Sequence, residues 1–462
     1  MSIKIYFRLC VLMLFVAAAS SCKKDHFTKV DISDLNPDEA ATNTALDQWL
    51  KTTFLDEYNV NVIYHYHRYY HESDRNVSPP KVETVQPMMT TVLEGYINPY
   101  REIAGVTFIR TNVPKEFVLY GSTSYDASGI GYAGTASGGV RVNLFGLDNF
   151  SLSPSFVTSR LNVIHHEFTH ILNQRYVMPP DFALITASSY KATWTSTPLD
   201  TAHKYGYVSS YASQNPAEDF AEMTSSLLVK GQSWFDNWVK TSTSTVGQAA
   251  LRSKESSVVN YFTSSLNVDF RALQKKVQLY IKDVLKDPTV TFPYWLNQNL
   301  YKTMTINLED PMYTTYGSSA DFATAYNQFK AVILAYSSSA QYHMDYLQFM
   351  FNSATSLTVR AAFTAAAGGT QYLADYTFSI GINSTTGATT FTKVAQAGTT
   401  GTYANAALFA TGFATTIQQY LTSNTFVGEW LQANMPASFF TRTGGFYQTG
   451  VPSNYFYGPL GQ

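Results

Sequence analysis

Cysteine, charge and clusters of basic residues are all scarce in this sequence. The chain has 462 residues, of which two are cysteines and 14% are charged, and its net charge at neutral pH is -2. A surface that binds nucleic acid needs concentrated Lys and Arg, so we expect no nucleic-acid partner. Small or extended neutral substrates suit such a chain better.

Aromatic and apolar residues, in contrast, are plentiful. Hydrophobic residues make up 45% of the chain, with 33 Tyr and 30 Phe, and this composition is far from that of a disordered protein. The chain is also too long for one typical core. We therefore expect two folded domains after any processed leader.

The N-terminus has the pattern of an export signal. Lys4 and Arg8 precede an apolar run, Leu9–Ala19, that is too short to span a bilayer comfortably. We expect residues 1–21 to be removed. One of the two cysteines lies within this segment, so the mature chain would keep Cys22 alone and form no disulfide.

A short motif follows the apolar run. The residues Ala19-Ser20-Ser21-Cys22 resemble the lipobox of bacterial lipoproteins, in which cleavage leaves an acylated N-terminal cysteine, although Ala19 stands where Leu is usual. The resemblance implies that acyl chains on Cys22 hold the protein on a membrane surface. Residues 22–45 are polar and would act as a tether. The alternative is an ordinary signal with a bystander cysteine.

A long helix is expected to begin at Ser153-Pro154, an N-cap residue followed by proline. Apolar residues then recur at spacings of three and four, at Leu161, Ile164, Phe168, Ile171 and Leu172.

Three of the nine histidines of the chain lie in this helix. His166 and His170 are one turn apart on one face and can reach the same metal ion, and Glu167 completes the His-Glu-x-x-His pattern of zinc hydrolases. In that pattern the glutamate acts as the base beside one zinc ion. The alternative is a pair of histidines on a partly solvated helix face. His165 projects about 100° away from His166, which favours packing or solvent exposure.

A catalytic zinc site usually has three protein ligands, and the segment 211–222 (YASQNPAEDFAE) contains the best candidate for the third. Asn215 and Pro216 predict a helix start, and Glu218 and Glu222 lie one turn apart on one face. A competing interpretation is that Glu218 caps this helix start. Glu222 would either orient a ligating imidazole or form a surface salt bridge.

These two segments together resemble the gluzincin metallopeptidases, especially those similar to the lethal factor protease domain. The resemblance implies that Glu218 is the third zinc ligand. It also implies that Tyr211, seven residues earlier, assists the reaction. The resemblance covers only the two motif helices.

The layout of most of the chain resembles the substrate import-associated zinc metallohydrolase lipoproteins of Bacteroidota-type bacteria, which combine a lipobox with a His-His-Glu-Phe-Thr-His helix. This resemblance implies an outer-membrane lipoprotein, with the cell surface favoured over the periplasmic face. It also implies a TonB-dependent importer and its binding lipoprotein as partners.

The region upstream of the helix should supply a sheet. Residues 116–120 (EFVLY) and 139–147 (GVRVNLFGL) are strand-like, and an edge strand over the cleft would pair with an extended substrate. Residues 129–134 match the dinucleotide fingerprint, but strand-like residues follow where a helix should start, so we expect a loop. His65 and His67 suggest a second metal site, although an aromatic-rich packed surface is favoured because no third ligand is identifiable.

The fold class expected is α+β: a zincin-like metallopeptidase domain at 46–305, with a mixed sheet and active-site helices, then a mainly β domain at 320–462. In the latter, alternation from Tyr372 to Ile382 predicts a strand, and residues 383–389 (NSTTGAT) a turn.

The leading hypothesis is a lipid-anchored zinc metallopeptidase that cleaves peptides or proteins. A second hypothesis is a non-catalytic lipoprotein that captures a glycan or peptide for an importer, and a third is a zinc hydrolase acting on another amide or an ester. The intact Glu167 disfavours the second, because a purely structural zinc site needs no general base.

Overall fold

The structure is a computed structural model, and it describes residues 44–127, 129–137, 140–366, 369–430 and 435–462. Residues up to Lys51 form a unit of their own, in which Thr44 caps helix α2 (Ala45–Leu50). The expected signal, Cys22 and the tether up to residue 43 lie outside the described residues. Among the helices described, none is long and apolar enough to cross a membrane.

A four-stranded mixed sheet lies upstream of the first motif helix. Its order is β1-β2-β6-β5, with β5 antiparallel to β6 and the other pairs parallel. The strands are β1 (Asn61–Ile63), β2 (Glu116–Leu119), β5 (Gly134–Ser137) and β6 (Arg141–Leu144). Both predicted strands are thus confirmed, as β2 and β6.

The expectation of a loop over residues 129–134 is wrong in part. Gly131–Tyr132 forms β4, which pairs with β3 (Ser124–Tyr125), and β5 begins at Gly134. Glycine weakens the strand pattern in sequence, yet here the backbone approaches its neighbours closely. A Cβ at Gly134 would lie 2.7 Å from Cγ1 of Val163. Strands in place of a helix also rule out the dinucleotide site.

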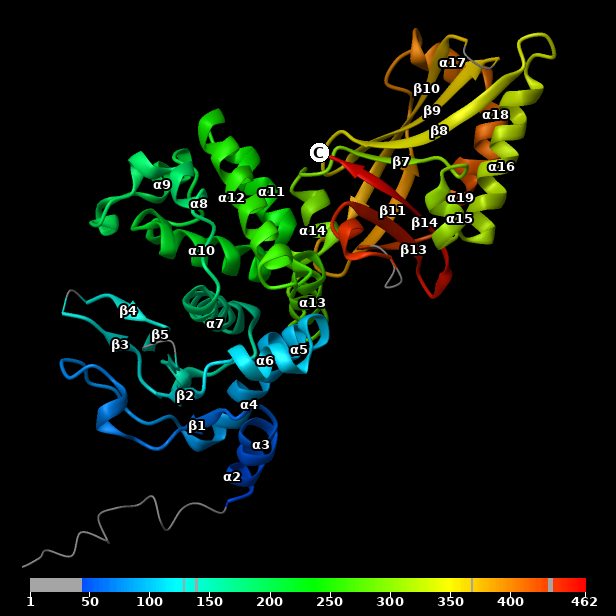
Figure 1. Cartoon of the computed structure of the whole chain (residues 1–462). Helices are drawn as coiled ribbons and strands as arrows, with labels where there is room; N and C mark the ends of the chain where they lie inside the picture. Colours follow the sequence, from blue (N-terminus) through cyan, green and yellow to red (C-terminus); the bar gives the residue numbers. More distant parts are fainter. Residues whose placement is uncertain (1–43, 128, 138–139, 367–368, 431–434) are drawn as a thin grey trace, which may run out of the picture. The chain divides into compact units, whose positions relative to one another are not determined.

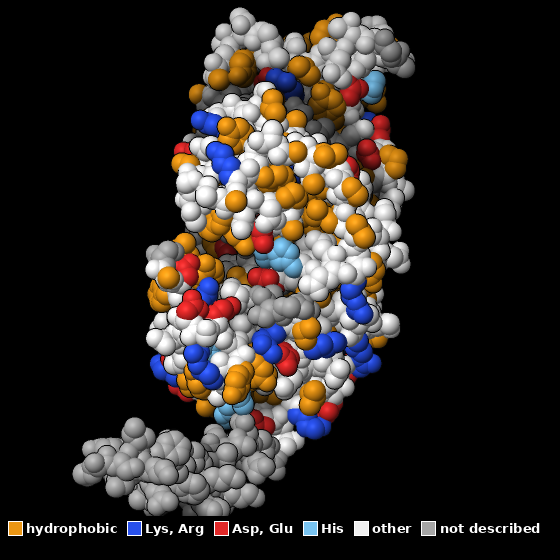
Figure 2. Space-filling view, turned by 60° about the vertical axis from the view of Figure 1, so that its left-hand side comes forward, with side chains coloured by type: hydrophobic (Ala, Val, Ile, Leu, Met, Phe, Trp, Pro, Cys, Tyr) orange, Lys and Arg blue, Asp and Glu red, His pale blue; other side chains and the backbone are white. Residues whose placement is uncertain are grey.

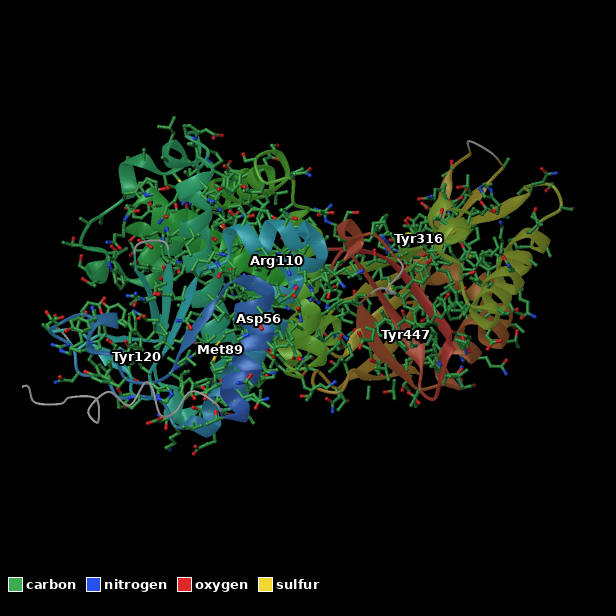
Figure 3. The ribbon with its side chains drawn as sticks, turned by 60° about the horizontal axis from the view of Figure 1, so that its bottom comes forward. Asp56, Met89, Arg110, Tyr120, Tyr316 and Tyr447 are labelled. Carbon is green, nitrogen blue, oxygen red and sulfur yellow. The ribbon has the colours of Figure 1, made fainter. Side chains whose placement is uncertain are left out.

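Helices make up most of the rest of residues 52–283 (Figure 1). The first group consists of α3 (Asp56–Tyr58), α4 (Val82–Val92), α5 (Asn98–Ala104) and α6 (Val106–Asn112). Arg110, labelled in Figure 3, joins two of them, because its guanidinium lies 3.0 Å from the Glu57 carboxylate.

The second group holds the motifs. It consists of α7 (Pro154–Arg175), α8 (Phe182–Ile185), α9 (Leu199–Lys204), α10 (Pro216–Val229), α11 (Gly231–Thr241), α12 (Thr245–Ser264) and α13 (Phe270–Asp283). Both predicted helix starts, at Ser153-Pro154 and Asn215-Pro216, are confirmed. The apolar residues at three- and four-residue spacing along α7, including Leu161 and Phe168, are buried, so the helix packs by its apolar face.

The C-terminal part is a closed, antiparallel barrel in the order β10-β11-β12-β13-β14-β7-β8-β9. Its strands are β7 (Thr303–Ile306), β8 (Tyr342–Phe351), β9 (Ser356–Ala365), β10 (Gln371–Ile382), β11 (Ala388–Lys393), β12 (Phe426–Trp430), β13 (Thr443–Gln448) and β14 (Val451–Gly461). The predicted strand at 372–382 is confirmed as β10. In the predicted turn, the Asn383 side chain accepts hydrogen bonds from two backbone amides.

The barrel includes residues that the sequence assigned to the catalytic domain. Strand β7 spans the expected boundary at residue 305, and it closes the barrel because Met304 pairs with Leu460 on one side and Phe349 on the other. Phe292, at the start of α14 (Phe292–Asn297), packs 5.6 Å from Phe446. The hydrophobic core of the barrel therefore extends back to α14.

Helices share the core of this mainly β part. They are α15 (Pro311–Tyr316), α16 (Ala320–Ala335), α17 (Thr402–Leu408), α18 (Ala410–Phe413) and α19 (Gln419–Thr422). Phe413 stacks on Tyr376 of β10 with ring centroids 3.5 Å apart. Phe329 of α16 contacts the ring of Phe413 edge-on. Aromatic packing between helices and strands thus fills this core.

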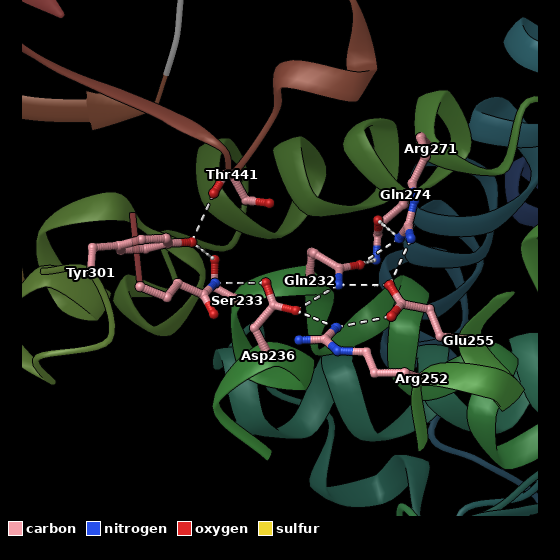
Figure 4. Close-up of polar contacts among 10 residues, drawn as sticks. Gln232, Ser233, Asp236, Arg252, Glu255, Arg271, Gln274, Tyr301 and Thr441 are labelled. Atoms are coloured by element: carbon pink, nitrogen blue, oxygen red, sulfur yellow. Dashed lines mark hydrogen bonds and ion pairs between the residues drawn. The ribbon is translucent and has the colours of Figure 1, made fainter. Parts of the chain in front are cut away.

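A polar network connects the barrel with helices α11, α12 and α13 (Figure 4). Tyr301 donates a hydrogen bond of 2.8 Å to the Thr441 carbonyl and accepts one of 2.8 Å from Ser233 on α11. Arg271 and Glu255 pair at 2.6 Å in the same network. Because these groups are largely buried, the join between the two parts rests on hydrogen bonds as well as on packing.

Candidate metal centre

Two imidazoles from α7 meet at one point. His166 and His170 are one helical turn apart, and their Nε2 atoms lie 3.1 Å from each other with the ring planes at 75°. Two neutral imidazole nitrogens at this distance both present lone pairs unless a proton or a cation lies between them. This arrangement is what a shared metal ion requires.

Glu218 of α10 brings a carboxylate to the same point. Its Oε2 atom lies 3.0 Å from Nε2 of His166 and 3.2 Å from Nε2 of His170. The helix start is capped by Asn215, whose side chain accepts hydrogen bonds from the amides of Ala217 and Glu218. The Glu218 carboxylate faces the two histidines and does not form a capping box with Asn215, so the capping interpretation is not supported.

The spacing of these three atoms fits a zinc ion. Ligands at about 2.0 to 2.2 Å from a tetrahedral centre lie about 3.3 to 3.6 Å from one another, close to the three distances above. His166, His170 and Glu218 are also the one set of potential metal ligands found among the described residues. Two imidazoles and one carboxylate are the donors of a catalytic zinc site with a position left for water.

The histidines near β1 do not form a second site within the described part of the chain. His65 is exposed, and the ring of His67 contacts that of Tyr70 edge-on at 5.3 Å. His71 in turn lies 3.2 Å from the hydroxyl of Tyr66. This surface is the aromatic cluster that the sequence favoured.

Glu222 lies behind the first histidine. Its Oε1 atom is 2.9 Å from Nδ1 of His166, and its Oε2 atom accepts a hydrogen bond of 2.6 Å from Ser209. Burial alone would lower the pKa of His166, but Glu218 and Glu222 outweigh burial and raise this pKa to about 10. Glu222 is therefore placed to orient the imidazole, and the surface salt bridge does not form.

Glu167 lines the pocket beside the ligands. The pocket has a volume of about 630 Å³ and is also lined by His170, Tyr211 and Glu218. Figure 2 shows histidine and acidic side chains gathered where the middle of the face is hollowed. Burial raises the pKa of Glu167 above its ordinary value, although the two histidines partly oppose this rise. A carboxylate with a raised pKa is a better proton acceptor.

Tyr211 reaches the pocket from a 3-10 turn, Tyr211–Ser213, just before α10. Its ring lies 5.9 Å from that of His166 and meets Trp194 edge-on at 5.0 Å. Burial, reinforced by the charge of Glu218, raises the pKa of Tyr211. The phenol therefore stays protonated at neutral pH and can donate a hydrogen bond.

His165 faces away from the pocket. It is fully buried among Tyr96 and Tyr100, with ring centroids 5.5 and 5.8 Å away. Burial lowers its pKa to about 4, so it packs as a neutral ring. Of the two expectations for His165, packing is confirmed and solvent exposure is wrong.

A buried ion pair next to the third ligand was not predicted. Asp219 lies 2.7 Å from Nζ of Lys254 on α12, and both side chains are 0% exposed. Tyr190 donates a hydrogen bond of 2.8 Å to the same carboxylate. Asp219 belongs to the acidic segment of α10, but the sequence does not show which residue pairs with it. Lys254 lies 35 positions later, at a spacing that predicts no contact.

The chain was compared with known proteins in three ways. A crystal structure described as "a putative zinc-binding metallo-peptidase from Bacteroides caccae ATCC 43185" has 25% sequence identity and a TM-score of 0.45, over 53% of this chain and 94% of that chain. No curated protein matches the chain. A family model described as "Putative zinc-binding metallo-peptidase" matches residues 39–271, half of the 462 residues. The chain therefore belongs to this family of zinc-binding metallopeptidases.

Proposed function

We propose that the protein is a zinc-dependent hydrolase that cleaves peptide bonds. The observation that supports this most directly is the meeting of two imidazoles and one carboxylate at a single point, with Glu167 in the same pocket. A structural zinc site would normally have four protein ligands and no base. Three ligands beside a carboxylate with a raised pKa fit catalysis better.

Each residue has a separate task in this proposal. A zinc ion at this point would supply Lewis-acid chemistry, lowering the pKa of water and polarising a carbonyl oxygen. Glu167 accepts the proton of the attacking water and passes it to the leaving amine. Glu222 keeps Nδ1 of His166 protonated, so that Nε2 presents its lone pair to the metal position.

Tyr211 is proposed to act on the oxygen of the substrate carbonyl. Its phenol is protonated and lines the same pocket as Glu218. As charge builds on that oxygen during attack, the phenol donates a hydrogen bond that strengthens in the transition state.

We further propose that Cys22 is acylated and holds the protein on the outer membrane, on the cell surface, next to a TonB-dependent importer and its binding lipoprotein. The support comes from the lipobox-like residues before Cys22 and from the family resemblance of the sequence. Cleavage products would then be released beside the importer.

A peptide library tests the hydrolase proposal. The zinc-loaded protein should cleave a subset of peptides, and the Glu167→Gln variant should bind zinc equally but lose cleavage. Glu83→Gln, an exposed position on α4, serves as the matched control. Bound zinc with no Glu167-dependent cleavage of any peptide would favour the capture protein. Cleavage limited to ester or non-peptide amide substrates would favour the third hypothesis.

A further inference from the structure

A second pocket lies on the same side of α7 as the metal ligands. Ser155, Ser159 and Asn162 precede His166 by eleven, seven and four residues, and these spacings place all of them on one side of the helix. Ser155 and Ser159 are exposed, and Asn162 is partly so. Exposure along this side of α7 thus increases from the buried His166 toward the start of the helix.

This pocket has a volume of about 600 Å³, and we call it the Lys230 pocket. Its walls include Ser159 and Asn162 of α7, Lys230 after α10, Trp234 of α11, and Tyr294 and Trp295 of α14.

The distance to the metal centre follows from the helices. Ser159 lies seven residues before His166, which corresponds to about 10 Å along α7. Lys230 ends the helix that Glu218 begins, so α7 and α10 run antiparallel between the two pockets. An extended peptide covers about 10 Å with three residues, so one chain can occupy both pockets.

Strand β5 passes beside both pockets. Thr135 lines the metal pocket, and the preceding Gly134 approaches Val163, which lines the Lys230 pocket, so closely that no side chain fits. Strand β5 is at the edge of the described sheet. A peptide that adds to this edge would therefore be guided from one pocket toward the other.

The Lys230 pocket contains a cation that forms no ion pair with the described residues lining the pocket. The ammonium of Lys230 lies 4.3 Å from the centre of the Trp234 ring and forms no ion pair within the described residues. The charge of Glu222 acts on it, but the Glu222 carboxylate itself contacts His166 and Ser209. Asp287 also lines the pocket, but its Oδ1 atom already accepts two hydrogen bonds from Thr289.

The aromatic walls are fixed in place. Trp234 stacks on Trp238 with ring centroids 5.5 Å apart, and Tyr294 meets Trp295 edge-on at 5.2 Å. Rigid rings beside an unpaired ammonium suit a ligand that joins an aromatic or apolar side chain to a carboxylate.

We propose that the Lys230 pocket is a substrate subsite that binds a peptide carboxylate about three residues from the cleaved bond, with an aromatic side chain against Trp234. This inference rests on the proposed function, since it names a feature of the substrate. The carboxylate belongs either to the C-terminus of a peptide or to an acidic side chain.

Calorimetry on the zinc-loaded full chain tests the proposal, with Glu167→Gln present so that no peptide is cut. The probes are a heptapeptide ending in Phe with a free carboxylate, its C-terminal amide, and an amidated peptide with Glu in place of the last residue. One or both carboxylate peptides should bind about tenfold more tightly than the neutral amide. The peptide that binds more tightly than the amide shows whether the carboxylate comes from the C-terminus or from an acidic side chain.

Variants assign this gain to the pocket. Lys230→Met should abolish it, Lys230→Arg should retain it, and Lys81→Met, at an exposed lysine elsewhere, should leave it unchanged. Equal binding of acid and amide peptides by the parent protein would overturn the proposal, as would a gain that survives Lys230→Met.

The same panel separates this proposal from the hydrolase assignment. Cleavage by the wild-type protein with no carboxylate preference in binding would refute the subsite and leave the hydrolase standing. If the protein cleaves no peptide but shows the Lys230-dependent gain in binding, the subsite would stand and the hydrolase assignment would be refuted.

Discussion

The Nδ1 atom of His166 lies 2.9 Å from Oε1 of Glu222, on the opposite side of the ring from the nitrogen that faces Glu218. Both carboxylates are largely buried, with side-chain exposures of 13% and 18%. One glutamate therefore contacts the His166 ring from behind, and the other lies at the proposed metal position. The first prediction follows from this contact.

Replacing Glu222 by Ala should weaken zinc binding by about 10- to 100-fold, because His166 loses the partner that sets its tautomer and ring orientation. Competition with a chromogenic chelator measures the affinity. Glu83→Ala provides the control at an exposed position. An unchanged zinc affinity in Glu222→Ala would show that the contact does not orient the ligand.

Replacing Tyr211 by Phe should lower kcat by about 100-fold, since loss of one donor to a developing oxyanion costs about 3 kcal/mol. The zinc content and KM should change little. Peptide hydrolysis under saturating substrate measures the effect, and Tyr69→Phe, at a tyrosine that is 92% exposed, should be silent. A Tyr211→Phe variant with wild-type kcat would exclude the phenol from the reaction.

Much of the metal centre could be predicted because its residues follow local rules. His166 and His170 are one turn apart, and Asn215-Pro216 marks the helix that presents Glu218. Residues that support the site from distant segments could not be found this way. Ser209 and Lys254 occupy positions whose type and spacing carry no signal, and their contacts exist only once α10 packs against its neighbours.

The fold likewise contains elements that local sequence patterns predict and elements that they do not. The alternating residues of β10 predicted a strand, whereas residues 129–134, which contain β4 and the start of β5, were expected to form a loop. In the barrel, β7 is a short strand separated from β14 by most of the C-terminal sequence. Pairing over such a separation is set by tertiary packing and leaves no local pattern.

The buried pair of Asp219 and Lys254 should be essential for stability. Lys254→Met would leave a carboxylate without its partner in a site with 0% exposure, at a cost of about 3 to 5 kcal/mol in the free energy of unfolding. Denaturant titration measures it. Lys276→Met breaks a pair with Glu102 that is nearly half exposed and should cost less than about 1 kcal/mol. Equal losses in both variants would contradict the role of burial.

Acid should weaken the network in Figure 4 through Glu255. Burial alone would raise the pKa of Glu255, but Arg271 and Arg252 outweigh burial and lower it. A folded-state pKa below the unfolded one means that the stabilisation is complete above the unfolded pKa, about 4.3, and is lost as the pH falls through the folded pKa.

Unfolding free energies of the wild type and Glu255→Gln should therefore differ most near neutral pH and converge as the pH falls below about 4. Titration with urea at a series of pH values gives both curves. A difference that stays constant down to pH 3 would contradict this assignment.

Metal content is the most direct test of the account. The purified wild-type chain should contain one zinc ion per molecule by elemental analysis, lose peptide hydrolysis on removal of the metal, and regain it with added zinc. Glu218→Ala, which keeps both histidines, should fold with the same thermal midpoint as the metal-free wild type and retain no zinc after dialysis. A Glu218→Ala protein that still holds one zinc with wild-type affinity would contradict the central claim that this carboxylate completes the metal centre.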